Sequence, residues 1–332
     1  MSSTFPAHLN SLALRLGHVD ELAEDIAELC FAFVRSNPLE LRERREAGRA
    51  YLIVHKIDEV PPVLGLLFSD AINQLRSSLD NALVLLIEHT RGARLTGPAE
   101  RAAQFLIYDD ESKYLEALRR MLPKLPELAL DEALGRRMYE LQPFRPLERI
   151  REMRTRRAGA THGGHHLRVL QEYSNADKHR RPHVFGVGNA KTRSITGAAD
   201  VHAEDVSEVA VGQQVSATDV GANEIVEVWP FVGLRRPLAG ELVPPGAELN
   251  ELHRYVAELA IPRLAGLPDG VSLPPRVDLR SLGLSEAERA ATASITYAHE
   301  RLGWRFSMEV AQAEFEARRR GDSGVQIPVQ ES

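Results

Sequence analysis

Apolar positions in the first 180 residues recur at spacings of three and four, which is the period of an amphipathic helix. The clearest stripe runs from Phe68 to Leu86 and predicts a helix that opens after Pro61-Pro62 and ends near Thr90. A second long helix is predicted over residues 6–34, with Asn37-Pro38 as its stop. Shorter helices are predicted at 99–104, 112–122, 131–141, 147–157 and 165–179.

The composition and the periodicity of the sequence change after Pro182. Residues 184–232 are rich in Val, Thr, Gly and Asp without a helical period, and they predict two to four antiparallel strands. Short strands are also predicted at 51–55 and 105–108. The charged run 40–49 indicates a solvated face or a loop.

A further helix is predicted at 248–264, and a last pair of helices is predicted at 285–301 and 306–319. We therefore expect a mainly α fold, a helical bundle with a small antiparallel β insert and C-terminal helices. Along the chain we expect three regions. They are a helical domain at 1–183, a β-rich region with a closing helix at 184–265, and a linker with a helical pair and a tail at 266–332.

Composition narrows the class of protein. No apolar run approaches the roughly 18 residues of a membrane helix, and the N-terminus lacks the features of a signal peptide. The single cysteine, Cys30, excludes an internal disulfide and a cysteine-rich zinc site, and its apolar surroundings indicate a small core residue. We expect a cytoplasmic protein that does not contact a membrane.

Charge is distributed unevenly along the chain. The net charge is −6, but residues 136–183 hold twelve Lys and Arg against five Asp and Glu, a local balance of +7. Such a basic block suggests an anionic partner such as RNA or a nucleotide. The alternative is that these arginines pair with acids on neighbouring helices.

The densest polar chemistry falls inside this basic block. Five of the twelve histidines lie within residues 162–183, around Asn175-Ala-Asp-Lys-His-Arg180. Charged groups are rarely buried unless they are paired. The stretch is therefore either a functional surface or a polar tie between elements.

Four blocks in this order resemble a widespread bacterial family of helical proteins that is similar to HEPN domains. They are Gln74-Leu-Arg-Ser-Ser-Leu-Asp-Asn-Ala-Leu83, Gln104-Phe-Leu-Ile-Tyr108, Leu141-Gln-Pro-Phe144 and Asn175-Ala-Asp-Lys-His-Arg180. The resemblance implies a helical bundle of the kind used in bacterial phage defence and toxin–antitoxin systems. It also implies metal-independent ribonuclease activity and two copies that meet as a homodimer.

In active HEPN proteins an arginine and a histidine stand four to six residues apart. Here Arg168 precedes His179 by eleven residues, so Arg76 on another helix would have to supply the arginine. On this interpretation His179 is the general base in RNA cleavage, and Arg76, Lys178 and Arg180 bind the phosphate. Asn175 would orient the histidine, Asp177 would complete the polar set, and no cofactor would be needed.

Two other interpretations remain open. His162, His165 and His166 could bind a metal together with Asp177, although no H-E-x-x-H pattern is present. Alternatively, Arg76–Asp80 and residues 175–180 could form a buried polar network, with Asp177 accepting a hydrogen bond from Arg76. The protein would then be a helical binding or interaction module rather than an enzyme.

Overall fold

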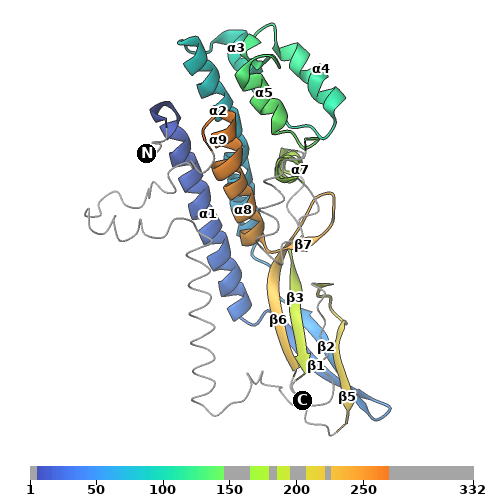
Figure 1. The fold of residues 1–332 in the computed structure, drawn as a ribbon. Coiled ribbons are helices and arrows are strands. Elements are labelled where there is room, and N and C mark those ends of the chain that lie inside the picture. The colour runs from blue at the N-terminus through green and yellow to red at the C-terminus, as the bar shows by residue number, and fades with distance from the viewer. Residues whose placement is uncertain (1–5, 146–164, 179–184, 195–206, 221–225, 269–332) are drawn as a thin grey trace, which may run out of the picture.

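Two long helices, α1 (Asn10–Arg35) and α2 (Val63–Arg91), pack against each other, with α1 at the left side of the helical part in Figure 1. The computed structural model describes residues 6–145, 165–178, 185–194, 207–220 and 226–268. The long apolar stripes predicted both helices, and both are confirmed. Gly92 ends α2 in the left-handed conformation, with φ of 67°, which glycine adopts without steric cost.

Shorter helices surround this pair. They are η1 (Ala7–Leu9), α3 (Gly97–Ala102), α4 (Glu111–Met121), η2 (Pro126–Leu128), α5 (Ala133–Glu140), α7 (His166–Lys178), α8 (Pro245–Arg254), η3 (Tyr255–Ala260) and α9 (Ile261–Leu264). The helices predicted at 147–157, 285–301 and 306–319 lie outside the described residues. Within the described ranges, every helix is too short or too polar to cross a bilayer.

The last described helix is continuous from α8 to α9 but changes its hydrogen bonding in the middle. Residues 255–260 form a π-helical turn, in which the N–H of Ile261 donates to the carbonyl of Val256, five residues earlier. Pro262 has no N–H to donate, so the regular ladder is already interrupted at this point.

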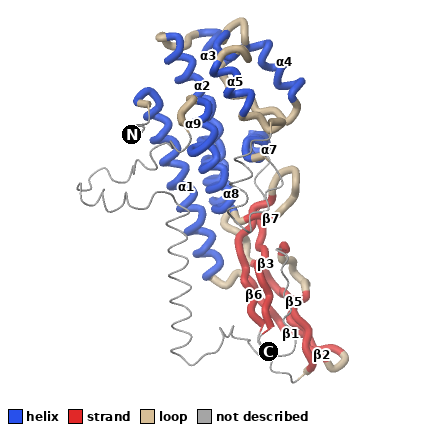
Figure 2. The backbone as a smooth tube through the Cα atoms, in the orientation of Figure 1, coloured by secondary structure: helices blue, strands red, loops and turns tan. Residues whose placement is uncertain are grey.

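The strands form two small sheets in which every described pairing is antiparallel. In Figure 2 the strands, drawn in red, gather below the helices. One sheet has the order β1-β2-β5 and the other β4-β3-β6-β7. The strand bounds are β1 (Leu39–Glu46), β2 (Arg49–Ile57), β3 (Phe185–Ser194), β4 (Ser207–Glu208), β5 (Gln214–Asp219), β6 (Val226–Arg235) and β7 (Leu242–Val243). The fold is thus mainly α with a small antiparallel β part, as predicted.

One local prediction was right in part and another was wrong. The charged run 40–49 is a solvated face, since its residues from Arg42 onward are exposed, but most of it is strand β1 rather than a loop, and no apolar alternation indicates this strand. Residues 105–108 are extended but belong to neither sheet. In addition, β2 from the first domain range pairs with β5 from the second, so the two ranges share one sheet.

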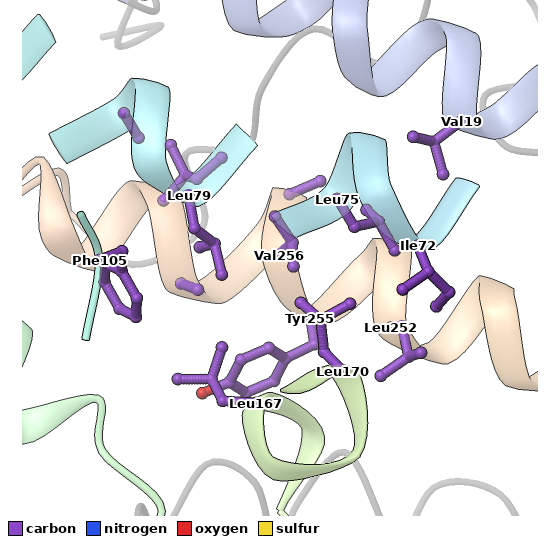
Figure 3. Close-up of a cluster of buried hydrophobic side chains, with 14 of the residues drawn as sticks. Val19, Ile72, Leu75, Leu79, Phe105, Leu167, Leu170, Leu252, Tyr255 and Val256 are labelled. Atoms are coloured by element: carbon purple, nitrogen blue, oxygen red, sulfur yellow. The ribbon is translucent and has the colours of Figure 1, made fainter. Parts of the chain in front are cut away.

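The hydrophobic core lies where α1, α2, α7 and the α8–η3 helix converge (Figure 3). Val19, Ile72, Leu170 and Tyr255 point into it from these four helices and are at most 1% exposed. Burying one such side chain contributes about 1.5–3 kcal/mol. Phe105 also enters this core, and for that reason the extended segment around it must be held in place.

Candidate functional site

The arginine of the α2 motif is buried, and its two Nη groups bind Asp80 and the backbone of Phe105. Arg76 is 5% exposed; its Nη1 donates to Asp80 Oδ1 at 2.8 Å and its Nη2 to the carbonyl of Phe105 at 2.6 Å. The same Asp80 oxygen accepts from the Phe105 N–H at 2.8 Å. Burial lowers the pKa of Arg76 and the charge of Asp80 opposes this, so the predicted i,i+4 ion pair is also a clamp on the Phe105 backbone.

A second clamp holds the other end of the same extended segment. Gln142 is completely buried; its amide nitrogen donates to the carbonyls of Leu106 at 2.7 Å and Met138 at 2.9 Å. Its amide oxygen accepts from the Tyr108 N–H at 3.1 Å. Side chains therefore satisfy the backbone groups that a neighbouring strand would satisfy in a sheet. Three of the four sequence blocks meet in this arrangement.

The opposite side of the α2 motif faces α1. Arg15 Nη1 donates to Gln74 Oε1 at 2.6 Å. Asn81 Oδ1, in the amide orientation that satisfies its neighbours, accepts from the same guanidinium at 3.2 Å. Polar residues of α2 thus bind two different elements on two sides of the helix.

The fourth block lies at the end of α7 and reaches α2 through Asn73. Asn73 Nδ2 donates to Asp177 Oδ2 at 2.8 Å in a partly buried contact. The sequence predicted that Asp177 accepts a hydrogen bond from Arg76. Asp177 accepts one from Asn73 instead, because the two Nη groups of Arg76 donate to Asp80 and to the Phe105 carbonyl. Asn175 is exposed and accepts from Gln171 at 2.6 Å.

The structure does not cover the whole of this block. His179, Arg180 and the side chain of Lys178 lie outside the described residues. The packing of α7 on α2 nevertheless brings the block containing Asp177 next to the helix that carries Arg76. Of the six residues proposed for a shared site, three can therefore be placed: one buried, one partly buried and one exposed.

A buried polar triad seats α7 against the rest of the protein. Arg236, 3% exposed, binds both oxygens of Glu248 at 2.8 and 2.6 Å, and the Tyr173 hydroxyl donates to Glu248 at 3.1 Å. Burial, with the charge of Glu248, raises the pKa of Tyr173. The triad joins the end of β6 to α7 and α8, so it fixes the helix that carries Asn175 and Asp177.

The two described histidines of the cluster lie at the start of α7. His166 is 3% exposed and its ring stacks on Tyr255 at 4.8 Å between centroids, while His165 meets Tyr255 edge-on. The Nε2 atom of His166 lies 3.9 Å from Glu251 Oε2. Among the described residues, no group of three His, Cys, Asp or Glu side chains is arranged to hold a metal; His162 lies outside them.

Three of the four described arginines of the basic block have local partners. Arg168 donates to Glu172 at 2.9 Å, Arg136 donates to the carbonyl of Asp131 at 3.1 Å, and Arg145 lies over the ring of Tyr139. Exposed pairs of this kind are weak, at about 0–1 kcal/mol, so they leave the arginines able to exchange partners with an anion.

Cys30 packs against the core as predicted. Burial raises the pKa of its thiol to about 12, and a thiol that stays protonated is a poor nucleophile.

Sequence reasoning found the blocks but missed several of the residues that connect them. Arg15, Asn73 and Gln142 were not singled out, although the last two lie in or next to recognised blocks. Only spatial proximity reveals their roles, since each bonds to a residue 34 to 104 positions away. Comparison of the chain with protein-family models, curated proteins and solved structures gave no match.

Proposed function

We propose that this chain is a HEPN-like helical binding module, in which the polar side chains of the four blocks hold the bundle together rather than cut RNA. The observation that carries the proposal is the position of Arg76. Its side chain is buried, and its two Nη groups donate to Asp80 and to the Phe105 carbonyl. An arginine that binds a phosphate needs those donors for the ligand.

The energetic argument supports the same role. To reach a phosphate, Arg76 would have to release two partners and leave a buried carbonyl unsatisfied. Each abandoned buried group costs about 1–3 kcal/mol. We infer that Arg76 keeps its place when a ligand binds, and that its loss would affect folding before it affected chemistry.

The ligand we propose is RNA or another anion, bound by the basic block 136–183, in a bacterial defence or toxin–antitoxin setting. The outer face of α7 supports this choice, since Asn175 and Arg168 are both exposed there and Arg168 has only a surface ion pair. Two copies of the chain could present two such helices, as the homodimer of the resembling family implies.

The exposure of Asn175 also favours a second candidate, a metal-independent endoribonuclease. In this alternative His179 is the base, Lys178 and Arg180 hold the phosphate, and Asn175 orients the histidine. Arg76 would act only indirectly, by holding Asp80 and the Phe105 backbone in place. The alternative therefore depends on residues that follow Asp177 along the chain.

One set of variants separates the two candidates. Full-length protein is incubated with total RNA in EDTA, and binding of a fluorescent single-stranded RNA is measured in parallel. Wild type and His179→Ala are compared with Arg119→Gln, which changes an exposed arginine of α4 outside the basic block. Binding without cleavage supports the module. Cleavage that His179→Ala abolishes, with an unchanged melting temperature, would establish the ribonuclease instead.

A further inference from the structure

A groove of about 260 Å³ lies on the β1-β2-β5 sheet, at the end of the molecule remote from α3 and α4 (Figure 1). Its lining includes Arg42 and Arg44 of β1, Ile53 and His55 of β2, and Val211 just before β5. None of these residues belongs to the four blocks, so the groove is separate from the helical site.

Two β-bulges shape this groove. In the β1–β2 pair, Glu40 lies opposite Lys56 and Leu41 opposite Val54, which leaves His55 as an extra residue. In the β2–β5 pair, Leu52 lies opposite Ser216 and Ile53 opposite Gln214, which leaves Val215 as a second extra residue. Bulges bend a strand and redirect side chains, and they are frequent beside functional sites.

Strand register places the basic side chains on one face. Arg42 lies opposite Ile53 and Arg44 opposite Tyr51, and residues opposite each other in an antiparallel pair point to the same side. Glu43, between the two arginines, also belongs to the lining, and Arg45 binds its carboxylate. The groove therefore presents two guanidinium groups, an imidazole and the Arg45-paired Glu43 beside the apolar Ile53 and the exposed Val211.

Neighbouring groups orient the two guanidiniums without occupying them fully. Glu40 accepts from Arg42 Nε at 2.9 Å, and Glu46 lies 3.4 Å from Arg44 Nη2. The Arg44 guanidinium also lies over the ring of Tyr51 at 5.6 Å. Each guanidinium has five N–H donors, and exposed ion pairs are worth only about 0–1 kcal/mol, so a doubly charged anion can compete for the remaining donors.

We propose that this groove binds a phosphorylated nucleoside, either a free mononucleotide or the phosphorylated end of an RNA strand. Arg42 and Arg44 bind the phosphate, and the base lies against Ile53 and Val211. The volume lies just below the roughly 300–1,000 Å³ range of small-molecule sites, which suits one nucleotide rather than two. This site does not depend on the function proposed for α7.

The test uses the full-length protein and calorimetric titration with AMP, adenosine and inorganic phosphate. The double variant Arg42→Gln/Arg44→Gln is compared with Arg45→Gln, which removes the same charge type from the same strand but on the opposite face. We expect AMP to bind more tightly than either fragment. The double variant should weaken AMP binding by about tenfold or more, as loss of charged hydrogen bonds predicts, while Arg45→Gln changes it less than about twofold.

Competition experiments then distinguish the two sources of the nucleotide. A short RNA with a 5′-phosphate should displace AMP if strand ends are bound, whereas an RNA that cannot displace it identifies the free mononucleotide as the ligand. Absence of saturable binding to AMP would overturn the proposal. Equal losses in the double variant and in Arg45→Gln, or adenosine binding as tightly as AMP, would overturn it as well.

Discussion

Asn73 on α2 donates a 2.8 Å hydrogen bond to the carboxylate of Asp177 on α7. The two residues are 104 positions apart, and their contact joins the residue just before the first of the four blocks to the last block. Because α7 is also fixed by Tyr173 through Glu248, the end of this helix has two independent polar attachments. The position of Asp177 therefore follows from α2.

A double-mutant cycle should detect this bond. Asn73→Ala and Asp177→Ala are each expected to lower the free energy of unfolding, with a coupling of about 1 kcal/mol, since a hydrogen bond to a charged group is worth slightly more than a neutral one. Urea denaturation of the wild type, both single variants and the double variant provides the measurement. Strictly additive effects would show that the contact contributes nothing.

Breaking the Arg76–Asp80 clamp should be far more damaging. Asp80→Ala leaves the Arg76 charge buried and removes the acceptor for the Phe105 N–H, and we expect a loss of about 3 kcal/mol or more. The control is Glu172→Ala, which breaks the exposed pair with Arg168 and should cost less than about 1 kcal/mol. Similar melting temperatures for the two variants would contradict the structural role of the clamp.

Gln142 should control the order of residues 105–108 specifically. In Gln142→Met, which keeps the approximate volume but lacks both polar groups, the Tyr108 N–H and the Leu106 carbonyl lose their partner. We expect about 2 kcal/mol of destabilisation and faster amide exchange at Tyr108 than at α2 amides. Uniformly increased exchange over the whole bundle would instead indicate a global effect.

Acid should destabilise the protein through His253. This imidazole is buried, its Nε2 donates to the Leu16 carbonyl at 3.0 Å, and burial lowers its pKa despite the opposing charge of Asp20. The unfolded chain then takes up a proton that the folded protein does not, so the stabilisation is complete above a pH of about 6.5 and is lost as the pH falls below it.

Melting temperatures at pH 7.5 and 5.5 test this linkage. His253→Gln keeps a hydrogen-bond donor but cannot titrate, so its melting temperature should fall less on acidification than that of the wild type. An acid-induced fall in His253→Gln as large as that of the wild type would exclude the buried imidazole as its source.

The sequence by itself determined the elements that carry a periodic pattern. The stripe from Phe68 to Leu86 specified α2 because a helix buries one face at every third or fourth residue, and Gly92 specified its end. The i,i+4 spacing of Arg76 and Asp80 was enough to predict their ion pair, since that geometry is local to one helix. The composition of residues 184–232 likewise predicted strands.

Only the tertiary structure decided what those elements contact. Strand β1 forms because its backbone pairs with β2. Its side chains are charged and exposed, so their sequence has no apolar alternation that would predict this pairing. The segment 105–108 looks like a strand because it is extended and apolar, but its backbone partners are the side chains of Arg76, Asp80 and Gln142. Similarly, Asp177 binds Asn73 rather than Arg76 because the Nη groups of Arg76 already donate to Asp80 and Phe105. Which donors are already bound depends on the whole fold.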